Sequence, residues 1–469
     1  MLFDSPAYLI FLTLVVVVYW KLQWKQQNLF LLAASYFFYG WWDWRFLLLM
    51  MASTGIDYLI ARQIAASLDP RQRRFLLIVS LVINFSILGF FKYFNFFAGT
   101  LTHTLAMVGA GPLTIQFFTI ILPPGISFYT FQEVAYIVDV YSGKLEPADS
   151  ILDYALFISL FPHLIAGPIQ RPSHLLPQVQ NARILQPAAF FDGLMLMVSG
   201  LFRKCVIADQ SALIANGCFS GHLGHGLPVT IVGSIAFALQ IYGDFSGYSN
   251  LARGSAQLLG FHFMVNFRQP YLATSLQDFW RRWHISLSTW LRDYLYVPLG
   301  GNRHGELKTY RNLMLTMLLG GLWHGANWTF VIWGAIHGLG LSVERLFRPH
   351  GDRAPAPGPL AIWTKRAVTF AIVCFAWVFF RAASVSDALR MISDISINGA
   401  RPELGTAAVV IGIVAMICLS IDLRLEAAGE EYLFQSLGLQ RRCAAGVALI
   451  AATLVLAGSE PNAFIYFQF

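Results

Sequence analysis

The sequence predicts an all-α polytopic membrane protein. Hydrophobic residues make up 57% of the 469 positions, charged residues only 12%, and the mean hydropathy is +0.58. An average soluble protein carries about 25% charged residues, because its surface must be covered by them. The apolar stretches lack the alternation of a membrane β-barrel. We therefore expect about 9 to 12 transmembrane helices, together with re-entrant and interfacial helices.

Apolar segments of helical length follow one another along the whole chain. A helix needs about 20 such residues to cross a bilayer. The candidates are 6–20, 28–42, 45–61, 75–97, 116–141, 151–166, 189–207, 229–252, 312–326, 327–343, 366–380, 404–421 and 444–460. Polar, glycine or proline residues interrupt 28–61 and 151–166, which are therefore candidate re-entrant stretches. The Pro/Gly-rich stretch 348–360 is too short to separate two domains, so we expect one transmembrane domain over residues 1–469.

Basic residues predict the orientation in the membrane. Lys21 and Lys25 follow the first apolar segment, which places them in the cytoplasm and the N-terminus outside. The arginines of 62–74 and 253–311 place those segments inside, whereas 98–115 and 220–228 lack Lys and Arg and are expected outside. The net charge of +7 fits such cytoplasmic loops, and no basic run mixed with aromatic residues indicates nucleic-acid binding.

The stretch GGLWHGANWTFVIWGAIHG (320–338) places two histidines in apolar sequence. An ionisable group at membrane depth indicates function more often than packing, and imidazole suits a general base. His324 is therefore the first catalytic candidate, with Trp323 and Asn327 beside it as binding candidates. The alternative is a core histidine between helices. For His337 we favour packing, because glycines surround it, and both imidazoles reach one atom only if the chain turns between them.

A second candidate centre is LQDFWRRWHISLSTWLRDYLYVPLGG (276–301). Its tryptophans and leucines follow helical spacing, which predicts an interfacial or re-entrant amphipathic helix on the cytoplasmic side. His284 lies beside the apolar face, one turn from Trp280 and from Ser288. It is the second catalytic candidate; the alternative is an interfacial histidine without a chemical role.

Polar residues interrupt three further apolar stretches. In 121–143, Glu133 and Asp139 either line a polar cavity or pair with buried arginines, and we favour pairing. The prolines of 160–172 predict a re-entrant cavity wall. The stretch QIYGDFSGYSN (240–250) is a further candidate wall, in which Asp244 is a candidate binding residue.

Several catalytic motifs are absent from the sequence. It contains no GxSxG, no GxxxxGK[ST], no HExxH and no GxGxxG after a strand. The five cysteines form no CxxC, and no His, Asp or Glu cluster has metal-ligand spacing. We therefore expect no disulfide framework, no metal and no permanently bound cofactor. The chemistry that these absences leave is a histidine acting as a general base, with neighbouring polar side chains, in an aqueous pocket within the bilayer.

Six stretches together resemble the membrane-bound O-acyltransferase family, and within it the bacterial alginate O-acetyltransferase branch. They are PPGISFYTFQ, FPHLIAGPI, YGDFSGYS, FWRRWHISLSTWLRDYLYVPLGGNR, GGLWHGANWTFVIWGAIHG and FIYFQF, in the family's order over almost the whole chain. The resemblance implies a membrane enzyme with a tunnel that moves an acyl group from a cytosolic thioester to a hydroxyl. The histidine of the family's WHG motif maps to His324, and a second polar position maps to His284.

The resemblance also implies substrates and partners. It implies acetyl-CoA as the cytosolic donor and an exported polysaccharide such as alginate or cellulose as the final acceptor. It also implies that the chain lies in the inner membrane of a bacterium, usually with a separate periplasmic acetyltransferase as its partner. The donor's phosphates would meet the basic segment, although ordinary cytoplasmic charge explains at least part of it. The candidates there are Arg281, Arg282, Arg292 and Arg303.

Alternatives remain open. Acceptors other than an alginate-like glycan include peptidoglycan, and the transferred group could be D-alanine destined for teichoic acid. A transporter of a lipid-linked sugar also fits broken helices and polar groups near the midplane, as does a non-catalytic scaffold of an export complex. Transfer of an acetyl group by the purified protein separates the enzyme from these last two.

Overall fold

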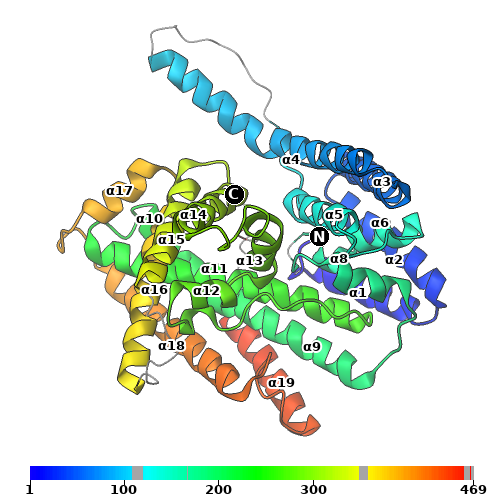
Figure 1. The fold of residues 1–469 in the computed structure, drawn as a ribbon. Helices are drawn as coiled ribbons and strands as arrows, with labels where there is room; N and C mark the ends of the chain where they lie inside the picture. The colour runs from blue at the N-terminus through cyan, green and yellow to red at the C-terminus, as the bar shows by residue number, and fades with distance from the viewer. Residues whose placement is uncertain (108–119, 166, 348–357, 459–464, 466–469) are drawn as a thin grey trace. The chain divides into compact units, whose positions relative to one another are not determined.

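The computed structural model describes residues 1–107, 120–165, 167–347, 358–458 and 465 (Figure 1). Helices make up most of them, and within these ranges the only bridge between extended segments joins Gly224 to Ala400. The predicted all-α class is therefore confirmed. Of the expected outside loop 98–115, residues 98–107 belong to a helix and residues 108–115 lie outside the described residues, as do most of the stretch 348–360 and most of the FIYFQF tail.

The chain forms two compact units. The first comprises Met1–Phe190 with Ser255–Met264, and the second comprises Phe191–Gly254 with Val265–Phe469. The first unit contains α1 (Pro6–Tyr19), α2 (Trp24–Gly40), α3 (Trp44–Ala66), α4 (Pro70–Met107), α5 (Ile126–Tyr141), α6 (Ile151–Ser159), α7 (Phe161–Leu164) and α8 (Pro172–Gln180).

The second unit holds most of α9 (Pro187–Phe202) and of α11 (Leu227–Leu258). Its other elements are η1 (Arg203–Ala208), α10 (Asp209–Phe219), η2 (Pro270–Leu272), α12 (Leu276–Arg282), α13 (Ile285–Leu291), η3 (Arg292–Tyr296), α14 (Glu306–His324), α15 (Trp328–Leu346), α16 (Pro359–Arg381), α17 (Val385–Ser393), α18 (Glu403–Ala428) and α19 (Leu439–Leu456).

Six described helices are long and apolar enough to cross a membrane: α3, α4, α11, α16, α18 and α19. The apolar helix α1 is shorter, at 14 residues. These helices establish a multi-pass membrane protein, and the total of about 9 to 12 crossings stays a prediction. The stretch 151–166 is interrupted as its proline predicts, because α6 ends at Ser159 and the four-residue α7 follows.

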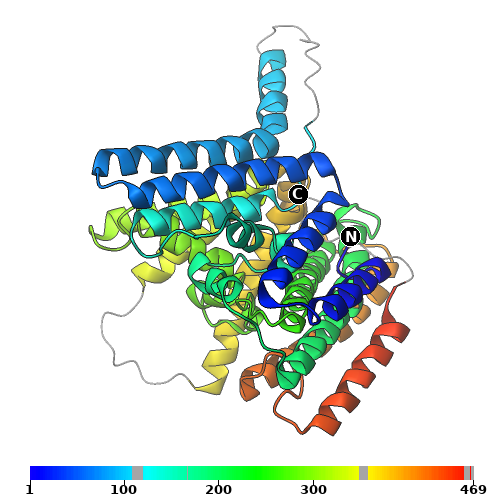
Figure 2. The same ribbon diagram turned by 90° about the vertical axis from the view of Figure 1, so that its right-hand side faces the viewer.

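In the first unit, α3 packs against both α4 and α5, and α3 runs beside α4 (Figure 2). Local sequence sets where these helices begin. The Ser5 hydroxyl accepts a hydrogen bond from the Tyr8 N–H and Pro6 occupies the first turn of α1, while the Asp43 carboxylate caps α3 through the Arg45 N–H. The starts of α1 and α3 are therefore fixed by capping residues in the local sequence.

In the second unit, α14 and α15 form a closely packed hairpin (Figure 1). A Cβ on Gly321 would lie 2.2 Å from the Phe330 carbonyl oxygen, and one on Gly334 would lie 2.3 Å from that of Met317. Only glycine permits this approach of the two backbones. The small-residue packing predicted around His337 is thereby confirmed.

Candidate active site

His324 is the last residue of α14, at the tip of the α14–α15 hairpin. The chain turns there because Gly325 is extended, with φ −168°, and the Asn327 side chain caps α15 by accepting from the Thr329 N–H. The imidazole is 5% exposed, and its ring centroid lies 5.1 Å from those of Trp333 and Phe380. The first catalytic candidate thus sits in an aromatic environment.

The turn also brings His337 to the same tryptophan. The His337 ring lies 4.9 Å from the Trp333 ring and 6.0 Å from that of Phe279, with which it is stacked. The Trp280 indole N–H donates to His337 Nδ1 at 3.3 Å. These contacts pack the ring among aromatic side chains, as its glycine-rich surroundings favoured, while Nε2 has no hydrogen-bond partner among the described residues.

His284 stands at a break in the chain. Helical spacing predicted one amphipathic helix over 276–301, but the structure divides it into α12, α13 and the π-helix η3. The break lies at His284, whose φ of 43° and ψ of 54° are left-handed. Asn266, which lies outside this stretch, bonds the residues after the break. Its backbone carbonyl accepts a hydrogen bond from the Ile285 N–H at 2.9 Å, and its Oδ1 accepts one from the Ser286 hydroxyl at 2.6 Å. A left-handed non-glycine residue stores strain, which is typical of functional sites.

The His284 imidazole is completely buried. Its ring packs edge-on against Phe245 at 4.6 Å and against Trp323 at 6.0 Å. Neither ring nitrogen has a hydrogen-bond partner among the residues that the structure describes. Buried polar atoms are rarely left unpaired in native proteins, so these nitrogens are available to a substrate or a water molecule.

Trp323 joins the two catalytic candidates. Its ring centroid lies 6.0 Å from that of His284 and 5.0 Å from that of the adjacent His324. The sequence separated these histidines by 40 positions, and the fold brings both to one indole. Two imidazoles in an aromatic, desolvated environment can exchange protons with a substrate where water is scarce.

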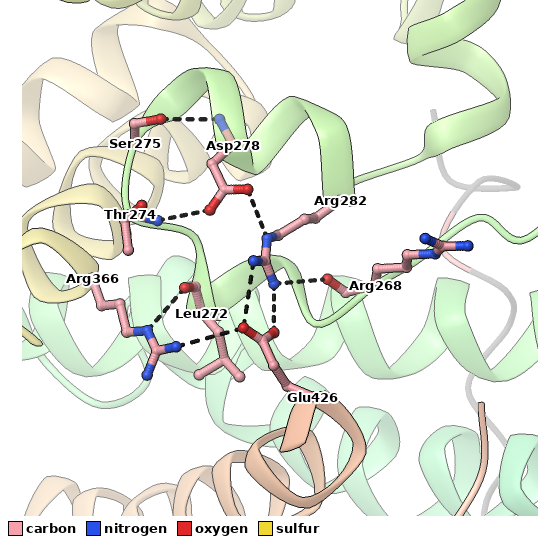
Figure 3. A network of polar contacts seen from close by, with 8 residues as sticks. All are labelled: Arg268, Leu272, Thr274, Ser275, Asp278, Arg282, Arg366 and Glu426. Carbon is pink, nitrogen blue, oxygen red and sulfur yellow. Dashed lines mark hydrogen bonds and ion pairs between the residues drawn. The ribbon is translucent and has the colours of Figure 1, made fainter. Parts of the chain in front are cut away.

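Arg282 is held in a polar network (Figure 3). Its guanidinium donates to Asp278 at 2.8 Å and to Glu426 at 2.5 Å, and Arg366 contacts the same Glu426 at 3.6 Å. Arg282 therefore has its charge matched by carboxylates inside the protein. The Arg268 guanidinium points away from this network in the same view.

A cavity of about 480 Å³ adjoins the network, between α11, α12 and the end of α18. Its charged lining comprises Arg203, Arg253, Arg268, Arg281, Arg282, Glu426, Glu430 and Glu431. Arg203 pairs with Asp422 at 3.0 Å, and Arg253 with Glu431 at 2.6 Å. By contrast, Arg268 and Arg281 are exposed, and neither has a carboxylate within 4.0 Å in the described ranges. The cavity therefore presents two unneutralised guanidinium groups.

Arg268 is the residue that sequence reasoning missed. It was counted only as cytoplasmic charge, because nothing in the local pattern shows which cavity a loop arginine lines. The extended segment before Gln269 (φ 44°) carries it to the cavity, and its N–H donates to the Arg282 carbonyl at 3.0 Å.

The remaining predicted binding residues lie elsewhere. Arg292 pairs with the adjacent Asp293 at 2.7 Å, and Arg303 is exposed and does not line the cavity. Asp244 is buried against Lys204 at 3.1 Å and accepts from the Ile465 N–H at 2.6 Å. Besides capping α15, Asn327 donates from Nδ2 to the Ala383 carbonyl at 3.1 Å. Arg292, Asp244 and Asn327 therefore have partners within the protein.

Comparison with known proteins gives a family. The family described as MBOAT, membrane-bound O-acyltransferase, matches residues 147–385, which contain both histidines. A protein of Pseudomonas aeruginosa named "Probable alginate O-acetylase" is 44% identical over 397 residues, 83% of this chain and 74% of its own length. A peptidoglycan O-acetyltransferase of Helicobacter pylori is 39% identical over 435 residues, 85% of this chain and 80% of its own.

The name of a more distant relative describes the transfer of a different acyl group. The teichoic acid D-alanyltransferase of Bacillus subtilis is 27% identical over 273 residues, 55% of this chain and 68% of its own length. The names of all three relatives describe acyl transfer, in keeping with the family resemblance of the six sequence motifs. The chain belongs to the membrane-bound O-acyltransferase family and is a multi-pass membrane O-acyltransferase.

Proposed function

We propose that the protein transfers acetyl groups from cytosolic acetyl-CoA, across the inner membrane of a bacterium, to an exported alginate-like polysaccharide. The acceptor hydroxyl belongs to the glycan itself or to a periplasmic partner acetyltransferase. The relatives named for acetyl transfer are 39–44% identical and the D-alanyl relative is 27% identical, which favours acetyl as the transferred group. The observation that carries the proposal is the approach of His284 and His324 to one indole.

His324 serves as the general base in this proposal. It takes the proton of the acceptor hydroxyl as that oxygen attacks the thioester carbonyl, and the C–S bond then breaks to release the CoA thiolate. His284 donates a hydrogen bond to the developing oxyanion or protonates the leaving sulfur. The proton removed from the alcohol balances the one gained by the thiol. The aromatic walls limit hydrolysis of the thioester by excluding water.

The two unneutralised guanidinium groups suit the donor. Acetyl-CoA carries phosphates, and arginine binds phosphate oxygens through two parallel N–H donors. We place these phosphates at Arg268 and Arg281, in the cavity of about 480 Å³. Because Arg282 is already paired with Asp278 and Glu426, it positions the cavity wall instead.

The orientation follows from the loop charges. We place the N-terminus in the periplasm and the start of α4, with Arg71, Arg73 and Arg74, in the cytoplasm. Cysteines introduced singly at Ser5 and at Gln72, in a background without the native cysteines, test this. A membrane-impermeant thiol reagent added to intact spheroplasts labels the first and spares the second; the reverse pattern refutes the orientation.

Product analysis tests the donor and the acceptor. The purified protein in lipid nanodiscs receives acetyl-CoA labelled in its acetyl group, with alginate oligosaccharides, peptidoglycan fragments or a periplasmic extract. Mass spectrometry that finds the label on a hydroxyl of alginate or of a partner protein supports the proposal. Label on peptidoglycan selects the second relative's activity, and absence of transfer from acetyl-CoA to any acceptor refutes the proposed donor.

A further inference from the structure

Two carboxylates lie deep inside the first unit, far from the histidines in sequence. Asp57 on α3 is 1% exposed and Glu133 on α5 is 0% exposed. Asp57 precedes Arg62, the first of the arginines expected in the cytoplasm, by five residues, or about 8 Å at 1.5 Å per residue. Ser53 and Thr54, which contact Glu133, precede Asp57 by about one turn. Because α3 is long and apolar enough to cross the membrane, both carboxylates lie at the depth of its membrane-spanning part.

Asp57 has the hydrogen bonds of an anion. The Ser80 hydroxyl donates to its Oδ1 at 2.6 Å, and the Asn84 amide donates to its Oδ2 at 2.7 Å. The second amide hydrogen of Asn84 goes to the Ser80 carbonyl at 3.1 Å. Each carboxylate oxygen therefore accepts one donor from α4, which is the arrangement of an ionised carboxylate.

The contacts around the Glu133 carboxyl group outnumber the hydroxyl hydrogens that its neighbours on α3 can donate. The Ser53 and Thr54 hydroxyls both lie 3.0 Å from Glu133 Oε1, and the Ser53 hydroxyl is also 3.1 Å from the Met50 carbonyl. Three contacts need three protons, and two hydroxyls supply two. A proton on Glu133 completes the set. Ser53 and Thr54 also precede Asp57 by one turn on α3, so Glu133 of α5 contacts α3 one turn before Asp57, on the same face of that helix.

No positively charged side chain pairs with either carboxylate in the part of the chain that the structure describes. In the same ranges, the buried oxygens Glu133 Oε2, Tyr129 Oη and Tyr154 Oη have no hydrogen-bond partner. Tyr129 lies one turn before Glu133 on α5, and the Tyr154 ring contacts the rings of Tyr58 of α3 and Tyr136 of α5. The carboxyl group and two tyrosines of this unit thus each have a buried oxygen without a hydrogen-bond partner among the described residues.

Charged groups on the neighbouring helices have contacts of their own. Arg62 of α3 donates to the Tyr58 hydroxyl and the Asp149 carbonyl, and Lys92 of α4 contacts the Ser127 hydroxyl at 3.4 Å. His163 of α7 contacts Gln132, and Asp153 of α6 accepts from Asn28. The last acidic group, Asp139 of α5, is six residues beyond Glu133 and lies on another face.

We propose that Asp57 and Glu133 form an intramembrane proton-binding site, which holds one proton on Glu133 beside an ionised Asp57. Two like charges this close, in a medium of low dielectric constant, repel too strongly for both to stay ionised. The proton removes one charge and supplies the third hydrogen bond. The site is independent of acetyl transfer, so it stands whether or not the histidines act as described.

Infrared spectroscopy of the full chain in lipid nanodiscs reads this proton directly. We expect the carbonyl stretch of a protonated carboxylic acid at neutral pH, lost in Glu133→Gln and retained in Glu146→Gln, which alters an exposed glutamate. In Asp57→Asn the repulsion is gone, so the band should be lost at a lower pH than in the wild type. If Glu133→Gln fails to fold, the wild-type band and its shift in Asp57→Asn still test the proposal.

Thermal unfolding distinguishes a proton from a metal cation. Gln is isosteric with the neutral acid, so Glu133→Gln should unfold within a few degrees of the wild type at any Na⁺ concentration. The proposal is overturned if the wild type lacks the acid band at neutral pH, if the band survives in Glu133→Gln, or if Na⁺ raises the unfolding temperature of the wild type and not of Glu133→Gln.

Discussion

The His284 imidazole packs edge-on against the Trp323 indole, with ring centroids 6.0 Å apart, although 39 residues separate them in the chain. Because His324 follows Trp323 directly, this contact fixes where the second histidine stands relative to the first. It depends on the left-handed backbone at His284, which turns the imidazole away from the course that a continuous helix would give it.

His284 should matter for the rate rather than for donor binding. We expect His284→Ala to lower kcat by about 10²–10³-fold, the usual cost of removing one oxyanion donor, with little change in the KM for acetyl-CoA. Steady-state kinetics of labelled acetyl transfer measure both constants. An exposed histidine, His222, is the control, and His222→Ala should keep both. A rise in KM alone for His284→Ala would assign His284 to binding instead.

The cavity arginines should matter for donor binding. Loss of one charge-assisted contact costs about 1.5–3 kcal/mol, so Arg268→Gln and Arg281→Gln should each raise the KM for acetyl-CoA about 10-fold or more and leave kcat near its wild-type value. Added salt should raise the wild-type KM as well.

Arg303 provides the matched control, because it is exposed but does not line the cavity. Arg303→Gln should leave the KM unchanged. If it raised the KM as much as Arg268→Gln did, the donor site would be a general basic surface and not this cavity.

The close approach of α14 and α15 should make Gly334 sensitive to any side chain. A Cβ there would lie 2.3 Å from the Met317 carbonyl oxygen, so Gly334→Ala forces the backbones apart and should destabilise the protein by about 1–3 kcal/mol. A Cβ on Gly412 of α18 would meet no atom within 4 Å, and Gly412→Ala should be neutral or slightly stabilising. Unfolding temperatures in detergent compare the two; equal effects would contradict the packing argument.

The sequence predicted the all-α membrane class and the packing of His337 because both leave local signals. A high apolar and low charged content indicates a chain surrounded by lipid, and glycines spaced along a helix indicate close contact with another helix. The break at His284 left no such signal, since Trp283 and Leu287 keep helical spacing across it. Only the hydrogen bonds that Asn266 accepts from Ile285 and Ser286 show why the helix stops there, and Asn266 lies outside the helical stretch.

Long-range pairing was the other limit. Arg282 looked like a free donor-binding residue, but its partner Glu426 lies 144 positions away. Glu133 was expected to pair with a buried arginine or to line a polar cavity, and the pairing was wrong: hydroxyls of α3 bond its carboxyl group. Local patterns give the type of a side chain and its face of a helix, whereas the partner depends on which elements the fold brings together.

The most direct test of the account is acetyl transfer by His324→Ala. Purified in nanodiscs, with labelled acetyl-CoA and the acceptor found by product analysis, this variant should lose about 10²–10⁴-fold in kcat and keep the unfolding temperature of the wild type. A folded His324→Ala protein that transfers acetyl groups at the wild-type rate would contradict the assignment of His324 as the general base.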